Sequence, residues 1–141
     1  MQMKRINTNS IFDIGKLIYP ELSYKINGIL FQTHNELGRY SRVRQYGNYI
    51  EKILKEEKIN YQREFPIANT GNTVDFLIEG KIILELKNVR ITTKKDYFQI
   101  QRYLQATDIK LGLLINFRSR YLRPKRIVRT RKGINEKYLH E

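Results

Sequence analysis

The chain has 141 residues, a length typical of one domain with its own hydrophobic core. It carries 27 basic and 14 acidic residues, and the resulting net charge of +13 favours a polyanionic partner such as nucleic acid. The absence of cysteine excludes a disulfide framework, a thiolate zinc site and a cysteine nucleophile. No apolar run approaches the ~18 residues that span a membrane, and no signal-peptide core is present, so we expect a cytoplasmic protein without a membrane partner.

The first half of the chain predicts two helices after an N-terminal extension. Residues 1–20 show no clear hydrophobic period. From Pro20, apolar residues recur at steps of three and four, and this pattern predicts a helix that ends at Gly38. Ser41 is a suitable N-cap for a second helix, which we expect to end between residues 57 and 59.

Three strands, a helix and a further strand are predicted next. Residues 61–67 have the pattern of a strand, and residues 74–87 form two short apolar runs around Gly80, as in a β-hairpin. Thr93 and Asp96 resemble a capping box at the start of a third helix. Residues 110–117 are almost continuously apolar, as in a strand that is covered on both faces.

The predicted fold is therefore α/β, a small mixed sheet flanked by helices, in the order α-α-β-β-β-α-β followed by a basic tail. Within the basic segment, residues 126–129 could add a last strand. We expect the domain to span residues 21–128 and the basic C-terminal tail to span residues 129–141.

The hairpin carries two carboxylates and a lysine. Side chains alternate along a strand, so Glu85 and Lys87 share one face. Asp75 joins them only if the turn has an odd length: a two-residue turn places it on the other face, whereas a three-residue turn over residues 79–81 pairs it with Glu85. Gly80 tolerates the positive φ that the longer turn requires.

Two carboxylates and a lysine can support metal-assisted hydrolysis of a phosphodiester, because Mg²⁺ prefers oxygen ligands and an ammonium stabilises developing negative charge. An ordinary cross-strand charge pair is the alternative. Gln99 and Tyr103 lie four residues apart on the third helix and share a face that can approach the hairpin, although such a pair also occurs on plain surfaces.

Basic residues are dense near the C-terminus. Residues 118–134 contain eight Lys or Arg residues and no acid, and they can neutralise phosphates with salt-sensitive, sequence-independent affinity. A merely solvated basic tail is the alternative. The candidate nucleic-acid contacts are Arg118, Arg120, Arg123, Lys125, Arg126, Arg129, Arg131, Lys132 and, on the third helix, Tyr103.

Several motifs together resemble one protein family. They are Asp75, Glu85-Leu86-Lys87, Gln99-x-x-x-Tyr103-Leu104, Leu111 to Phe117, and two first-helix segments, Leu22 to Gly28 and His34 to Gly38. Their order and spacing over residues 19–128 resemble the GxxExxY-motif proteins of the PD-(D/E)XK nuclease superfamily. The resemblance implies a restriction-endonuclease-like fold, with Asp75 and Glu85 as ligands of Mg²⁺ or Mn²⁺, Lys87 as the catalytic lysine and Gln99 as an accessory residue.

The chain also departs from that pattern. Tyr40, Val43 and Tyr46 stand where the name-giving motif has Gly, Glu and Tyr, so only the tyrosine is kept. Nucleases of the superfamily often use an acid at the position of Val43 to help hold the metal. Val74 replaces the proline that precedes the metal-binding Asp in the superfamily, which is a milder change.

Three other side chains invite a role in the site. Glu36 and Glu64 are conceivable substitutes for the missing acid, although neither occupies the matching position. His34 could act as ligand or base, but its place on a helix more simply indicates a solvated or hydrogen-bonded side chain.

We therefore predict a metal-dependent nuclease that is weakened by the loss of the helix acid. The alternatives are a catalytically inactive nucleic-acid-binding module with the same fold and, more distantly, a structural RNA-associated protein whose hairpin charges are surface pairs. DNA and RNA both remain open as substrates, and a homodimer is compatible with the sequence.

Overall fold

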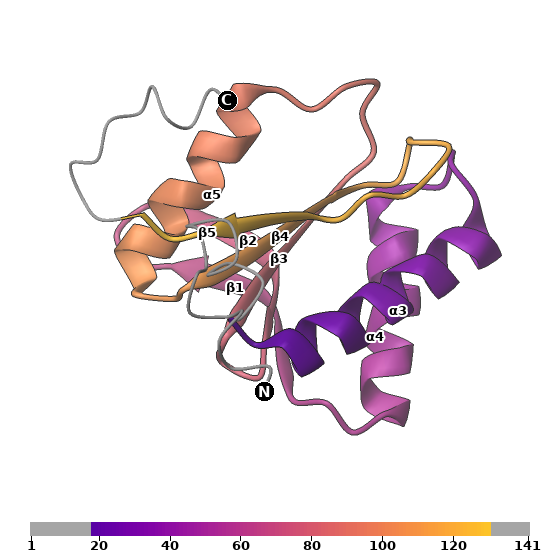
Figure 1. The fold of residues 1–141 in the computed structure, drawn as a ribbon, viewed down its shortest axis with the longest axis horizontal. Coiled ribbons are helices and arrows are strands. Elements are labelled where there is room, and N and C mark those ends of the chain that lie inside the picture. The colour runs from indigo at the N-terminus through magenta and orange to yellow at the C-terminus, as the bar shows by residue number, and fades with distance from the viewer. Residues whose placement is uncertain (1–17, 131–141) are drawn as a thin grey trace, which may run out of the picture.

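The structure, a computed structural model, describes residues 18–130 as one sheet with helices on both faces (Figure 1). The elements are α3 (Pro20–Leu37), α4 (Val43–Glu56), β1 (Tyr61–Ile67), β2 (Asn72–Ile78), β3 (Ile82–Lys87), α5 (Lys94–Thr107), β4 (Leu111–Asn116) and β5 (Lys125–Val128). Helices α3 and α4 cover one face and α5 covers the other (Figure 1). This arrangement confirms the predicted α/β fold and element order, and the basic segment contributes the last strand, β5, close to residues 126–129 where one was expected.

The sheet is mixed, with the strand order β1-β2-β3-β4-β5. Only β3 and β4 run parallel, and α5 is the crossover between them. Residues 111–115 of β4 are all buried, which explains the continuous apolar run in the sequence.

Side-chain alternation separates two hydrophobic cores. Phe76 and Leu84 lie opposite each other and pack towards α3 and α4, whereas Leu77 and Ile83 form the next pair and pack towards α5. Glu85 has the same parity as Ile83, so it lies on the α5 face of β3.

The hairpin turn has the odd length that the active-site prediction required. Ile78 pairs with Ile82, so residues 79–81 form a three-residue turn, and the Lys81 N–H donates to the Ile78 carbonyl at 2.9 Å. Glu79 and Gly80 both have positive φ, at 54° and 65°, a conformation that Gly80 adopts without steric strain. Continuation of this register places Asp75 opposite Glu85.

The N-terminus of α4 differs from the prediction by one residue. Arg42, not Ser41, is the N-cap, and its N–H donates to Gln45 Oε1 at 2.8 Å. The Ser41 hydroxyl instead donates to the Leu37 carbonyl at 3.1 Å, so it satisfies the end of α3. The predicted capping box of α5 is present, because the Thr93 N–H donates to Asp96 Oδ2 at 2.9 Å.

The described part of the basic C-terminal segment includes a strand. Residues 118–124 form the connection from β4, and β5 pairs antiparallel with β4 at the edge of the sheet. Residues 131–141 lie outside the described part of the chain. None of the helices within residues 18–130 has the length and apolar composition needed to cross a bilayer.

Candidate metal and nucleic-acid site

Asp75 and Glu85 meet where β2 and β3 separate. Backbone pairing between the two strands ends at Phe76 and Leu84. Beyond this pair, carboxylate side chains accept the hydrogen bonds of the backbone N–H groups. The Asp75 N–H donates to Glu85 Oε1 at 3.1 Å, and the Leu86 N–H donates to Asp75 Oδ2 at 2.7 Å. Two carboxyl groups are thus held together by backbone donors on rigid strands.

The two carboxyl groups share an environment that disfavours a double negative charge. Burial, and then the charge of Asp75, raise the pKa of Glu85 to about 8. Burial also raises the pKa of Asp75, opposed by its hydrogen bond from Leu86 and by the charges of Lys87 and Arg63. Glu85 therefore retains a proton near neutral pH, and a divalent cation that displaces this proton would relieve the repulsion between the two carboxyl groups.

Lys87 is anchored beside this pair. It lies two residues beyond Glu85 on the same face of β3, and its side chain is half-buried. Its Nζ lies 3.4 Å from Asp96 Oδ1, so the residue that caps α5 also holds the lysine.

Gln99 and Tyr103 lie on the same face of the sheet as Glu85. Gln99 Nε2 donates to the Tyr103 hydroxyl at 2.6 Å. Burial raises the pKa of Tyr103 and the negative charge of Glu85 raises it further, which places the tyrosine near the carboxylate. Tyr103 is only 4% exposed, so it offers little surface to a ligand, and its role as a nucleic-acid contact stays a prediction.

A pocket of about 570 Å³ opens on the α4 side of Asp75. Val43, the first residue of α4, lines it together with Asp75 and Leu86. The valine side chain is half-buried and packs against the α3 and α4 core, in agreement with the expectation that it offers no oxygen at this position.

Arg63 is a site residue that the sequence interpretation missed. Its Nη1 donates to Asn48 Oδ1 at 2.8 Å and to Glu51 Oε1 at 2.9 Å, and its charge lowers the pKa of Asp75. A Cβ on Gly47 would lie 2.5 Å from Arg63 Nη2, so this glycine makes room for the guanidinium. The glycine within the buried stripe of α4 was the available signal, because glycine inside a helix commonly marks a close approach.

A family model described as the PD-(D/E)XK nuclease superfamily matches residues 20–130, which include every helix and strand described above. The chain belongs to this superfamily. Searches of curated proteins and of solved structures found no match. The narrower GxxExxY assignment stays a prediction, as Val43 stands at the motif's acid position.

Tyr46, which stands at the tyrosine position of the GxxExxY motif, has a structural role. The Tyr46 hydroxyl donates to the Gly38 carbonyl at 2.5 Å, and its ring stacks on Phe117 with a centroid separation of 4.0 Å. His34 is likewise hydrogen-bonded, with Nε2 3.0 Å from the Ser119 carbonyl oxygen, as the simpler interpretation expected.

The oxygen ligands available for a metal are few. Within residues 18–130 no group of three or more Asp, Glu, His or Cys side chains is placed to hold a metal ion. Glu36 is exposed on α3, and Glu64 is exposed at the rim of the pocket. Asp75 and Glu85 supply two carboxyl groups, one fewer side chain than such a group requires.

The predicted basic contacts divide into two groups. Arg126 donates to Ser23 Oγ and to the Ile18 carbonyl, both at 2.8 Å, so it ties β5 to the start of α3, and Arg129 pairs at the surface with Asp108. Arg120, Arg123 and Lys125 are exposed, and Arg118 is half-buried. Arg131 and Lys132 lie outside the described residues.

Proposed function

We propose that the protein is a divalent-metal-dependent nuclease that hydrolyses phosphodiester bonds of nucleic acid. The observation that carries this proposal is the contact between Asp75 of β2 and Glu85 of β3, together with Lys87 on the same face of β3 as Glu85. Membership of the PD-(D/E)XK nuclease superfamily supports the same conclusion.

Asp75 and Glu85 are the residues that would hold Mg²⁺ or Mn²⁺. When bound, such an ion polarises a phosphoryl oxygen and makes a bound water more acidic. The two carboxylates are pre-positioned for this purpose by the Asp75 and Leu86 N–H groups, so little reorganisation is needed on binding.

Lys87 and Gln99 supply the remaining polar groups. The Lys87 ammonium, held by Asp96, provides positive charge for the negative charge that develops on the phosphate. Gln99, oriented by Tyr103, offers an amide that can orient water or a phosphate oxygen. Both side chains are half-buried, and each contacts a neighbouring side chain, Asp96 for Lys87 and Tyr103 for Gln99. These contacts favour a fixed geometry.

A catalytically inactive nucleic-acid-binding module is the second candidate. The observation that favours it is Val43, which places a hydrocarbon at the pocket position where the superfamily often has a third metal-binding acid. Two carboxylates hold Mg²⁺ weakly. If the ion does not stay bound, the protein would bind nucleic acid without cleaving it.

Cleavage assays on single- and double-stranded DNA and RNA, each with Mg²⁺, Mn²⁺ or EDTA, test the proposal. We expect cleavage only with a divalent ion, and a loss of about 100-fold or more in Asp75→Asn. Asparagine retains an oxygen that can accept from the Leu86 N–H, so the variant should fold and bind nucleic acid.

Glu56→Gln is the matched control, because it removes an exposed carboxylate at the end of α4. Cleavage that persists in Asp75→Asn would assign the activity to another site. Tight binding with no cleavage by any metal would establish the inactive module instead.

A further inference from the structure

The connection between α3 and α4 presents an exposed aromatic ring to solvent. Tyr40 is 72% exposed. The guanidinium carbons of Arg39 and Arg118 lie 5.4 and 5.2 Å from the centre of its ring. Two segments far apart in the chain therefore place positive charge around one accessible ring.

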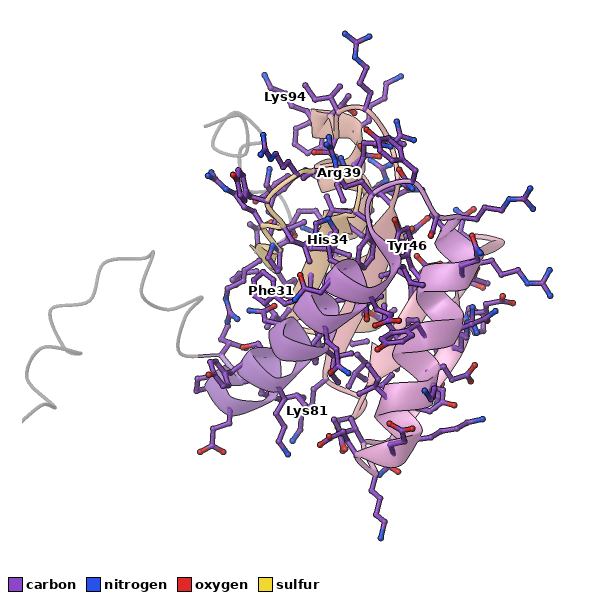
Figure 2. The ribbon with its side chains drawn as sticks, turned by 90° about the vertical axis from the view of Figure 1, so that its right-hand side faces the viewer. Phe31, His34, Arg39, Tyr46, Lys81 and Lys94 are labelled. Carbon is purple, nitrogen blue, oxygen red and sulfur yellow. The ribbon has the colours of Figure 1, made fainter. Side chains whose placement is uncertain are left out.

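This connection is fixed next to the candidate site. Arg39 Nε donates to the Arg118 carbonyl at 2.8 Å, and Arg118 Nε donates to Asn88 Oδ1 at 2.6 Å. The Asn88 amide in turn donates to the Ser41 carbonyl, and Asn88 directly follows Lys87. Arg39 lies at the same end of the molecule as Lys94, the first residue of α5, and Lys81 lies at the opposite end (Figure 2). The ring of Tyr40 is thus held by bonds that lead to the end of β3.

The β4–β5 connection repeats the combination of ring and cation. Tyr121 is 69% exposed, and the guanidinium carbon of Arg120 lies 5.4 Å from the centre of its ring. On the connection between β3 and α5, Ile91 is 73% exposed. Large apolar side chains that remain this accessible beside cations are available to stack on a ligand.

A small cationic pocket lies on the same face as Glu85. It has a volume of about 170 Å³, and Arg90, Arg123 and Lys125 contribute positive charge to its walls. Lys125 pairs with Leu114, and Leu114 pairs with Glu85, so the pocket lies across β4 from the carboxylate pair. A backbone phosphate matches both its charge and its size.

Exposed rings among cations distinguish one class of nucleic acid. The bases of a duplex are stacked within it, so their faces are not available to surface tyrosines. Unpaired bases present their faces and stack on aromatic side chains, while cations follow the phosphates. We propose that this surface binds single-stranded nucleic acid, with Tyr40 stacking on a base and the Arg90, Arg123 and Lys125 pocket holding a phosphate. The inference rests on the proposed function only in taking this strand to be the substrate of Asp75 and Glu85.

Fluorescence anisotropy on the full chain in EDTA tests the inference without any need for cleavage. The probes are a labelled oligothymidylate of about 20 nucleotides, longer than one binding site, and a blunt duplex of equal length. We expect the single strand to bind at least about tenfold more tightly than the duplex at one salt concentration. Equal or tighter binding of the duplex would overturn the proposal.

Variants of Tyr40 test the stacking contact itself. Tyr40→Ala should weaken binding of the single strand about 5- to 100-fold, the range that corresponds to one stacked base. Tyr40→Phe keeps the aromatic face and should bind within about twofold of the natural chain. Tyr24→Ala is the matched control, because Tyr24 is 80% exposed near the start of α3 and has no place on this surface.

Single-strand affinity that is unchanged in Tyr40→Ala would overturn the assignment. A thermal melt of each variant separates lost stacking from lost folding, and the Phe variant serves as the folded reference. The outcome is independent of the nuclease proposal. If the protein cleaves nothing but its single-strand binding depends on Tyr40, the nuclease proposal is wrong and the proposed binding surface is supported. If the protein is a metal-dependent nuclease whose binding does not depend on Tyr40, the nuclease proposal is supported and the binding surface is wrong.

Discussion

Asp75 and Glu85 face each other across the end of the β2–β3 hairpin, and the Asp75 N–H donates to Glu85 Oε1 at 3.1 Å. Ladder pairing between the strands ends one position earlier, at Phe76 and Leu84, so carboxylate oxygens accept backbone N–H groups there. Burial and the neighbouring charge of Asp75 raise the pKa of Glu85 at this contact, and the pH behaviour that we expect of the protein follows from that shift.

The metal-free protein should lose stability as the pH rises. The folded-state pKa of Glu85, about 8, lies above its ordinary value of 4.5, so the folded state retains a proton that the unfolded chain releases between these values. Unfolding free energy should therefore fall across this window, and Glu85→Gln should remove most of that fall. At pH 9 the variant should exceed the natural chain by about 1–3 kcal/mol, measured by urea unfolding in EDTA. Identical pH profiles would contradict the raised pKa of Glu85.

Metal binding should release protons below pH 8. A divalent ion competes with the proton held by Asp75 and Glu85, so its affinity should rise with pH and level off above about 8. Calorimetric titration of Mn²⁺ in buffers with different ionisation enthalpies measures the number of protons released. Glu56→Gln should behave like the natural chain, while a buffer-independent heat near pH 7 would rule out competition at this pair.

Val43→Glu should strengthen the metal site. Val43 lines the pocket with Asp75 and is the first residue of α4, where the helix dipole favours a negative side chain. A third oxygen ligand should tighten Mn²⁺ binding about tenfold or more and increase any cleavage. Val43→Gln controls for size and polarity without the charge. If both variants bind metal equally, the added carboxylate does not reach the ion.

Gly47→Ala and Gly28→Ala should change stability in opposite directions. A Cβ on Gly47 would lie 2.5 Å from Arg63 Nη2 and would displace a guanidinium that bonds Asn48 and Glu51. We expect this displacement to cost about 1–2 kcal/mol and to outweigh the roughly 0.5–1 kcal/mol that alanine gains over glycine within a helix. Nothing lies within 4 Å of a Cβ on Gly28, so alanine there should stabilise α3 by about 0.5–1 kcal/mol. Urea unfolding measures both changes, and a stabilised Gly47→Ala would show that Arg63 moves without penalty.

Arg126→Gln and Lys125→Gln should separate folding from nucleic-acid binding. Arg126 bonds Ser23 Oγ and the Ile18 carbonyl, so its loss should cost about 2 kcal/mol of unfolding free energy. Lys125 is exposed, so Lys125→Gln should leave the unfolding free energy within about 0.5 kcal/mol of the natural chain. The same substitution should lower the number of ions released on nucleic-acid binding by about one. Denaturation and salt-titrated anisotropy should be run on both variants. A destabilised Lys125→Gln, or an Arg126→Gln that changes only the salt dependence of binding, would contradict this assignment of roles.

Local patterns in the sequence were sufficient for the elements and for part of the site. Apolar spacing at steps of three and four marked α3 and α4, and alternation marked Glu85 and Lys87 as neighbours on one face, because both periods follow directly from backbone geometry. The Thr93 and Asp96 capping box was likewise visible, since its partners are three residues apart.

Only the tertiary structure decided which of these residues meet. The three-residue turn at Gly80 brought Asp75 opposite Glu85, a choice between registers that alternation within a strand leaves open. The pairing of β1 with β2 brought Arg63 beside Asp75, and the pairing of β5 with β4 turned Arg126 towards α3. Such contacts join residues far apart in the chain, so they depend on packing between elements and leave no periodic mark in the sequence.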